Sequence, residues 1–151
     1  MPIRRYRVSF SPGDECLRHI LSLIRAAEKT LDVCVFTITD DRIAQALVRA
    51  HERGIAIRII TDDDKVNDAG SDVRYLSSQG ISVRVDTSPS HMHHKFMLID
   101  SGVLLTGSYN WTRSAGKNNH ENLLSMAEPY FLSRFRKEFE SLWLTCVDFP
   151  V

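Results

Sequence analysis

The sequence has 151 residues and a formal net charge of zero, with 19 basic and 19 acidic side chains. This length suits one domain, 1–151, which can bury enough surface to fold without disulfides or metals. The even charge excludes a protein coated in positive charge, although a local basic cleft can still attract a phosphate. Three widely spaced cysteines exclude a disulfide framework and favour the reducing cytoplasm. We expect neither a signal peptide nor a membrane-spanning segment, because no apolar run is long enough.

The first half of the chain predicts strands that alternate with helices. Polar and apolar residues alternate where a strand is expected, and apolar residues recur at helical spacing where a helix is expected. The expected elements are a strand at 5–10, a helix across 17–27, a strand at 31–38, a helix from 41 to Gly54, a strand at 55–61, a short helix through Val73 and Leu76, and a strand at 81–85. This order is typical of parallel strands joined by helices.

The pattern changes after Asp86 to shorter strands. Asp100-Ser101-Gly102 predicts a hairpin turn between strands at 93–99 and 103–106. A short helix after Trp111 and a strand at 120–126 follow. A final helix from Pro129 carries apolar residues suited to a core or a dimer contact. We therefore expect an α/β fold with a mixed, mainly parallel sheet flanked by helices on both faces.

The densest group of polar residues surrounds the predicted hairpin. His93 and Lys95 are two apart on a predicted strand, so their side chains share one face. Ser108 and Asn110 repeat that spacing after the second hairpin strand, and the helix after Trp111 would turn free N–H groups towards the same place. Lysine and asparagine can bind phosphate oxygens, and histidine can attack phosphorus or protonate a leaving oxygen. These residues predict a phosphate-binding pocket.

These residues stand in patterns that resemble those of the phospholipase D superfamily. The stretch from His93 to Asp100 is similar to the family signature His-x-Lys-x4-Asp, and Gly107-Ser108-Tyr109-Asn110 is similar to Gly-Ser-x-Asn. Glu121 falls where the family keeps a glutamate. The likeness extends over nearly the whole chain and includes the small single-motif members, the bacterial Nuc-type endonucleases and the mitochondrial Zucchini group. The zinc-binding segment of the Zucchini group has no counterpart here, so no structural zinc is expected.

The resemblance implies a role for each motif residue. In such enzymes one histidine attacks phosphorus to form a phosphohistidine, and a second histidine protonates the leaving oxygen and then activates water. Lys95 and Asn110 would bind the phosphate oxygens, with support from Ser108, and Glu121 would orient the His93 ring. The implied catalytic set is His93, Lys95, Asp100, Ser108, Asn110 and Glu121, in which Asp100 would be structural.

The chain carries a single copy of the motif, since His19 and His51 have no lysine two residues later. The resemblance therefore implies a homodimer in which two His93 side chains face each other across a two-fold axis. Two adjacent imidazoles cannot both be charged cheaply, so their titration splits into coupled steps. One neutral and one protonated histidine is the pair that the implied reaction needs.

Three functions remain open at this point. The first is an endonuclease that cleaves nucleic-acid phosphodiesters in single-stranded DNA or RNA, which the lack of a lipid-docking apolar loop favours modestly. The second is a hydrolase of a phospholipid diester such as cardiolipin, and the third is a non-catalytic nucleic-acid-binding module. Arg113 and Lys117 are candidate substrate-binding residues, or they belong to a solvated loop.

Two groups of residues could instead hold a metal. His91, His93 and His94 are close in sequence, but neighbouring strand positions point to opposite faces and no cysteine pair accompanies them. Asp62-Asp63-Asp64 ends a predicted strand and could bind magnesium, or it could cap the next helix. We expect neither a metal nor another cofactor.

Overall fold

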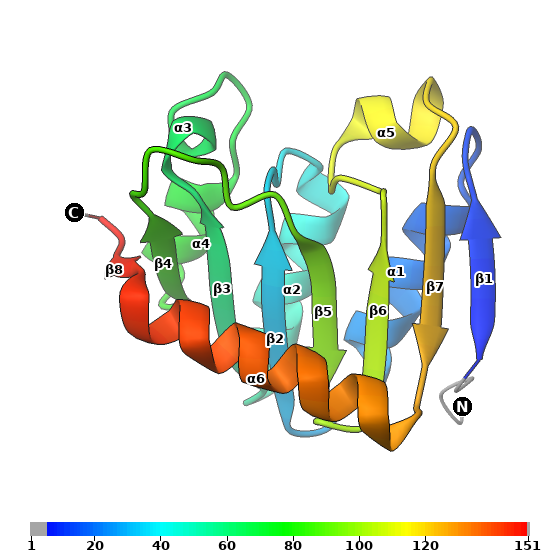
Figure 1. Cartoon of the computed structure of the whole chain (residues 1–151). Coiled ribbons are helices and arrows are strands. Elements are labelled where there is room, and N and C mark those ends of the chain that lie inside the picture. Colours follow the sequence, from blue (N-terminus) through cyan, green and yellow to red (C-terminus); the bar gives the residue numbers. More distant parts are fainter. Residues whose placement is uncertain (1–5, 151) are drawn as a thin grey trace.

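Residues 6–150 of the computed structural model form an eight-stranded mixed sheet in the order β1-β7-β6-β5-β2-β3-β4-β8 (Figure 1). The apolar, β-branched runs of the sequence lie in the central strands, as expected for segments buried on both faces. The strands are β1 (Arg7–Phe10), β2 (Thr30–Val35), β3 (Ala56–Asp62), β4 (Ser82–Asp86), β5 (Lys95–Ile99), β6 (Val103–Gly107), β7 (Asn122–Met126) and β8 (Val147–Asp148).

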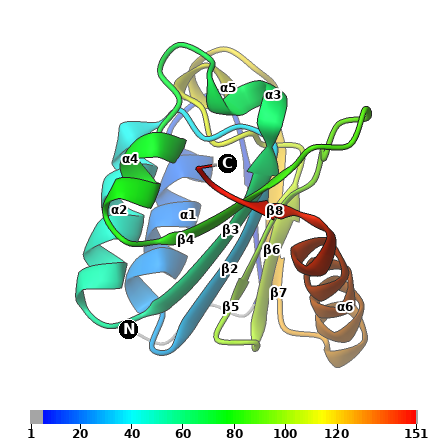
Figure 2. The same ribbon diagram turned by 90° about the vertical axis from the view of Figure 1, so that its left-hand side faces the viewer.

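Helices cover both faces of the sheet. The helices are α1 (Glu15–Ala26), α2 (Asp41–Glu52), α3 (Asp63–Val66), α4 (Val73–Ser78), α5 (Arg113–Lys117) and α6 (Pro129–Thr145). Figure 2 shows α1, α2 and α4 on one face and α6 on the other. The short helices α3 and α5 lie at one end of the sheet, at the top of Figure 1. The expected α/β fold with helices on both faces is confirmed.

The pairing of the strands corrects one part of the sequence prediction. Parallel pairing joins β2 to β3 and β3 to β4, where helices connect the strands. The other neighbours, including β2–β5 and β5–β6, pair antiparallel. The turn between β5 and β6 is too short for a parallel crossover, and Asp100 and Ser101 adopt φ angles of 53° and 55° in it. The expected mainly parallel sheet is therefore parallel only across β2, β3 and β4.

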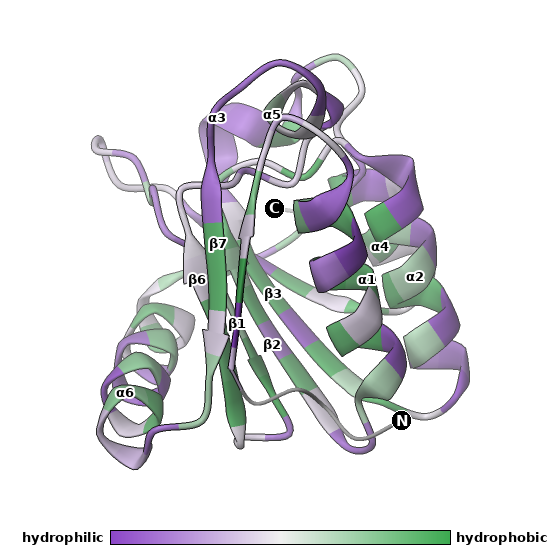
Figure 3. Cartoon of the chain, turned by 90° about the vertical axis from the view of Figure 1, so that its right-hand side faces the viewer, coloured by the Kyte–Doolittle hydropathy of each residue, from purple (hydrophilic) through white to green (hydrophobic). Residues whose placement is uncertain are grey.

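Two apolar cores hold the layers together. The larger core lies between the sheet and α1, α2 and α4, and it includes fully buried Ile20, Leu31 and Leu47. The smaller core lies under α6 and includes Phe96 and Phe139. The hydrophobic sides of the helices face the sheet in Figure 3. Burying each such side chain contributes about 1.5–3 kcal/mol, so these layers fix the strands on which the polar motif sits.

Several short elements depart from the sequence prediction. The two-residue strand β8 pairs with β4, and α3 forms where a loop was one alternative. The first strand begins at Arg7, and residue 5 of the predicted strand lies outside the described residues. Strand β5 begins at Lys95 rather than His93. Within residues 6–150 no helix has the length and apolar character needed to cross a membrane.

Candidate active site

The predicted pocket residues gather at one end of the sheet, between α3 and α5. Because β5 is antiparallel to β2, its start lies beside the end of β2, where Phe36 N–H donates to His94 O over 2.9 Å. Strand β6 ends at the same edge and β7 begins there. His93, Lys95 and Ser108 therefore line one cavity, and Glu121 contacts Ser108 beside it.

His93 and Lys95 are in direct contact. Lys95 Nζ donates to the carbonyl of His93 over 2.7 Å and lies 3.1 Å from His93 Nδ1. The ammonium thus holds one ring nitrogen and leaves Nε2 without a hydrogen-bond partner within residues 6–150. Because the Lys95 ammonium donates to Nδ1 there, the proton of a neutral ring lies on Nε2, so attack on phosphorus by Nε2 would require Lys95 to turn from the ring to the phosphate.

Ser108 and Glu121 form a second contact in the site. The Ser108 hydroxyl donates to Glu121 Oε2, and Asn119 Nδ2 donates to Glu121 Oε1 over 3.3 Å. Asn122 N–H donates to the same Ser108 hydroxyl over 3.1 Å. Within the described residues the side-chain partners of Glu121 are Ser108 and Asn119, so the expected orientation of His93 by Glu121 is absent from the single chain.

The backbone around Asn110 is fixed by close packing. A Cβ on Gly107 would lie 2.1 Å from the Asn122 carbonyl, so the approach of β6 to β7 requires glycine there. The side chain of Trp111 is buried, and the backbone N–H of this residue donates to Thr37 O over 3.2 Å. Within residues 6–150 the Asn110 amide oxygen is buried without a hydrogen-bond partner, so this acceptor is unsatisfied in the single chain.

Partial burial and local charge tune the two basic groups of the site. The pKa of His93 is lowered by removal from water, and further by the positive charge of Lys95. Burial also lowers the pKa of Lys95, while the Glu121 carboxylate opposes that shift. Desolvation disfavours the charged form of a base, so the lowered pKa of His93 favours its neutral ring.

Two open cavities flank His93, each with a volume of about 450 Å³. His93 and His94 line both of them. One cavity also includes Asp86, Glu138 and Leu142, and the other includes Lys95, Ser108 and Phe135. The final helix α6 was expected to serve a core or a dimer contact, and it also supplies walls of these cavities. A diester bound at His93 therefore has space for a substituent on either side.

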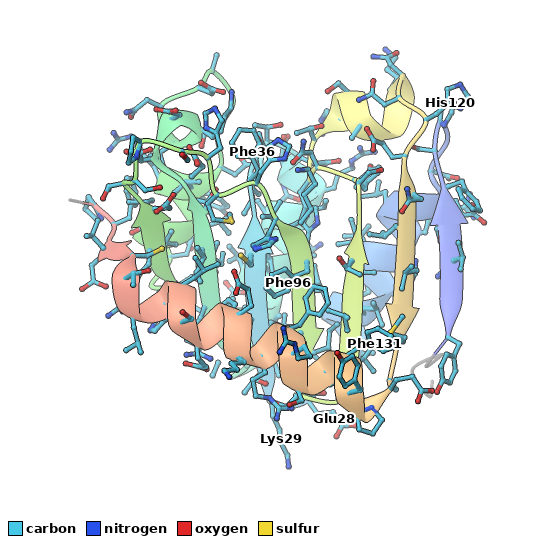
Figure 4. The ribbon with its side chains drawn as sticks, viewed as in Figure 1. Glu28, Lys29, Phe36, Phe96, His120 and Phe131 are labelled. Atoms are coloured by element: carbon cyan, nitrogen blue, oxygen red, sulfur yellow. The ribbon has the colours of Figure 1, made fainter. Side chains whose placement is uncertain are left out.

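Asp100 lies at the opposite end of β5 from His93. Its carboxylate accepts backbone N–H bonds from Glu28, Lys29 and Thr30 over 2.7–3.2 Å. Figure 4 labels Glu28 and Lys29 at the end of the sheet away from Phe36, which marks the site. Asp100 is therefore a member of the sequence motif without being a member of the pocket.

Arg113 and Lys117 begin and end the short helix α5, beside the pocket. Both side chains are exposed, and Arg113 Nη2 lies 3.4 Å from Asp41 Oδ2. The free N–H groups expected at the start of α5 are partly satisfied, since the Thr112 hydroxyl accepts from Ala115 N over 3.1 Å. The part of Arg113 and Lys117 in substrate binding stays a prediction.

The structure brings together residues from both of the sequence groups that were weighed as metal sites. His94 turns to Glu138, with Nε2 3.1 Å from its carboxylate. His91 Nδ1 lies 3.6 Å from Asp62 and 3.5 Å from Asp64. The ligand atoms of Asp62, Asp64 and His91 all lie within 4.8 Å of one another. Asp62 already accepts N–H bonds from Asp64 and Met92, so an ion pair with His91 accounts for this arrangement without a metal.

One residue of this site was not singled out in the sequence. The side chain of Phe36 is buried at the end of β2 and packs against the His93 ring, with ring centroids 4.5 Å apart. An apolar residue at the end of an apolar strand carries no sequence signal that distinguishes it from the core. Its contact with His93 depends on the antiparallel placement of β5 beside β2.

Comparison with known proteins places this geometry in a family. Residues 20–143 match the family described as "Cardiolipin synthase, PLD-like domain", a range that contains all the predicted site residues. The chain belongs to the phospholipase D superfamily. Its mixed sheet flanked by helices is that of a phospholipase D-like phosphodiesterase domain.

Members of the superfamily resemble the chain in both sequence and fold. A mitochondrial cardiolipin hydrolase of Chlamydomonas reinhardtii is 40% identical over 93% of this chain and 63% of its own length. The Homo sapiens protein of that name is 39% identical over 87% of this chain and 52% of its own length. The chain thus spans about half to two thirds of these relatives. The crystal structure of the phospholipase D family member Nuc from Salmonella typhimurium superposes with a TM-score of 0.90, at 26% identity, over 97% of this chain and 98% of Nuc.

Proposed function

We propose that this domain hydrolyses phosphodiester bonds through a phosphohistidine on His93. The observation that carries the proposal is that His93 and Lys95 lie side by side on one open cavity, and that His93 Nε2 has no hydrogen-bond partner within residues 6–150. A phosphate placed there would meet the Lys95 ammonium and the Ser108 hydroxyl, which line one of the cavities, and we expect the Asn110 NH2 group to bind it as well. Preorganised donors of this kind stabilise the charge that develops on phosphate oxygens.

The proposed reaction has two displacement steps. In the first, a neutral His93 nitrogen bonds to phosphorus and the P–O bond to the leaving group breaks, while a protonated histidine donates its proton to the departing oxygen. In the second, that histidine takes a proton from water, and the resulting hydroxide displaces His93 from phosphorus. The lowered pKa of His93 favours the neutral nucleophile that the first step requires.

The proton donor would come from a second copy of the chain. Within residues 6–150 the other histidines near the site are engaged elsewhere, since His94 pairs with Glu138 and His91 lies against Asp62 and Asp64. A two-fold dimer would bring His93 of the partner subunit opposite His93. The proposed unit is therefore a homodimer with one shared site.

We propose nucleic acid as the substrate, with the domain acting as an endonuclease on single-stranded DNA or RNA. The match to Nuc over almost its whole length supports this choice, because the motif resembles that of the Nuc-type endonucleases. The exposed cations Arg113 and Lys117 beside the pocket could bind flanking phosphates. The third alternative, a non-catalytic binding module, is disfavoured because each polar position of the motif is filled.

The names of the curated relatives favour a second candidate. Relatives at 39–40% identity are called mitochondrial cardiolipin hydrolase, so a phospholipid diester is the alternative substrate. The same names suggest mitochondria, whereas the cysteine usage favours the cytoplasm, and both locations stay predictions. The proposed chemistry is identical for lipid and nucleic acid, because the reacting group is a phosphodiester in both.

A substrate panel tests the proposed function. Labelled single-stranded DNA, RNA and cardiolipin vesicles are incubated with the protein in the presence of a chelator. We expect cleavage of the nucleic acids that weakens steeply with salt, since the binding of phosphates by cations releases counterions. His93→Ala should abolish cleavage, and His51→Ala, at the far end of α2, serves as the matched control. Turnover by His93→Ala would rule out the proposed nucleophile, and cleavage of cardiolipin alone would select the lipid.

A further inference from the structure

The end of β2 joins the two halves of the phosphate site. Phe36 N–H donates to His94 O over 2.9 Å, which connects it to the segment that carries His93. One residue later, Thr37 O accepts the N–H of Trp111, next to Asn110. The Thr61 hydroxyl also donates to Phe36 O over 3.1 Å and ties this segment to β3. The residues that follow β2 therefore set the separation between His93 and Asn110.

The Phe36 ring is surrounded by the basic groups of the site. Its centroid lies 4.5 Å from that of His93, at an interplanar angle of 51°, and 5.3 Å from that of His91. Lys65 Nζ and Lys95 Nζ lie 5.3 Å and 5.6 Å from the same centroid. A cation within about 6 Å of a ring face is attracted by the ring quadrupole. One aromatic side chain thus contacts the nucleophile and the lysine beside it.

Phe36 is rigid enough to hold these groups in place. Its side chain is buried, and both its N–H and its carbonyl are hydrogen-bonded to neighbouring segments. The His93 side chain, in contrast, is exposed on its other side, where the cavities lie. The ring is therefore a fixed wall that limits both the rotation of the imidazole and the access of water to it.

We propose that Phe36 is a positioning residue, whose ring orients His93 and keeps water from one face of the imidazole so that a nitrogen points at phosphorus. The proposal rests on the proposed function, and it adds a residue from outside the three sequence motifs. The charged groups that face His93 are Lys95, His91, His94 and Asp62, and none of them is removed by a change at Phe36. A change in His93 titration after substitution of Phe36 would therefore report the loss of the ring.

The test compares Phe36→Leu with Phe36→Tyr and Phe139→Leu. Leucine removes the planar ring and admits water, so the pKa of His93 should rise towards its ordinary value in an NMR titration. Loss of orientation should lower kcat about 10-fold or more with KM nearly unchanged, because misplacement by about 1 Å can cost a hundredfold. Phe36→Tyr keeps the ring and should keep both values. Phe139→Leu removes another buried ring, from the core under α6, and should lower stability alone.

The outcomes separate this inference from the proposed function. If Phe36→Leu has the kcat and the His93 titration of the wild type, or loses no more activity than Phe139→Leu, the positioning role is wrong. The NMR titration needs no substrate, so it decides the contact between Phe36 and His93 even if the wild type cleaves no diester. Absence of His93-dependent cleavage in the wild type would instead overturn the proposed function.

Discussion

Asp100 illustrates how one motif residue can serve the site from a distance. Its carboxylate accepts N–H bonds from Glu28, Lys29 and Thr30, which connect the β5–β6 turn to the start of β2. Burial works against the charge, but these three bonds prevail and lower the pKa of Asp100. Strands β2 and β5 are the two that carry Phe36 and His93 at their other ends. The bonds to Asp100 therefore fix the register on which the pocket depends.

Replacement of Asp100 by alanine should separate stability from catalysis. Because hydrogen bonds to a charged group contribute roughly 1.5–3 kcal/mol each and are partly replaced by water, we expect a loss of about 2 kcal/mol in the free energy of unfolding. A lowered pKa means that this stabilisation is complete above the ordinary value of 3.8 and is lost as pH falls through the folded value. Urea unfolding measures the loss of stability, and diester kinetics of the folded variant measure whether activity is kept. A stable variant without activity would place Asp100 in the chemistry.

At the scale of single residues, the spacing of polar side chains in the sequence indicated one pocket. The structure places His93, Lys95 and Ser108 around one cavity, and the roles assigned to them stay predictions. The i, i+2 spacing of His93 and Lys95 and of Ser108 and Asn110 was enough to place them near one edge. Glu121 contacts Ser108 in the single chain, so its expected contact with the His93 ring stays a prediction for the dimer. Phe36 was missed because its role is set by a neighbour that only tertiary pairing supplies.

At the scale of elements, β1, α1 and β7 are joined by a buried histidine. His19 on α1 lies 3.0 Å from the Ser9 hydroxyl through Nδ1 and 2.8 Å from the Ser125 hydroxyl through Nε2. Burial, and then the charge of Arg7, lower the pKa of His19 to about 4, while Glu15 opposes this shift. The neutral imidazole thus connects the edge strand β1 to β7, the strand that follows Glu121.

The burial of His19 predicts an acid-sensitive contribution to stability. A histidine that is neutral in the folded state takes up a proton more readily when unfolded, so folding loses stability as pH falls from about 6.5 to about 4. The loss from this residue is at most about 3 kcal/mol. His19→Gln should be less stable at neutral pH and should lack this part of the pH dependence. Urea unfolding of both proteins at several pH values measures it, and parallel curves would contradict the assignment.

The elements that the sequence predicted are those with enough residues to show a period. Helices α1 and α2 and strands β2 and β3 each carry a clear apolar pattern. The two-residue strand β8 and the four-residue helix α3 are too short for a period, and only their contacts define them. The turn at Asp100 predicted the antiparallel pair of β5 and β6, but the apolar pattern of the other strands does not indicate that β5 pairs antiparallel with β2 or β7 with β1, so the parallel share of the sheet was overestimated.

At the scale of the whole molecule, a single chain supplies half of the proposed catalytic pair. His93 has a neighbouring lysine and a free nitrogen, but within residues 6–150 no second histidine stands in a His-x-Lys context. The sequence could predict this incompleteness by counting motifs. It could not predict which surface the second copy covers, because that depends on the shape of the assembled fold.

A mixing experiment tests the shared site without knowledge of the dimer interface. Wild-type and His93→Ala chains are unfolded together in equal amounts and refolded, so that half of the dimers contain one chain of each kind. A mixed dimer holds one reactive histidine, which can serve as nucleophile or as acid but not as both. Only the wild-type dimers should then turn over, and activity should fall to about a quarter of that of wild type at equal total protein.

Independent sites in each chain would instead give about half of the wild-type activity, because every wild-type chain would work alone. His51→Ala chains, mixed in the same way, control for losses in refolding and should leave activity near the wild-type level, since His51 lies at the far end of α2. A quarter of the activity would also explain why one catalytic motif is sufficient in a domain of this size, since two-fold symmetry would supply the second imidazole. A value of one half would require the proton donor to be sought within the chain, beginning with His91.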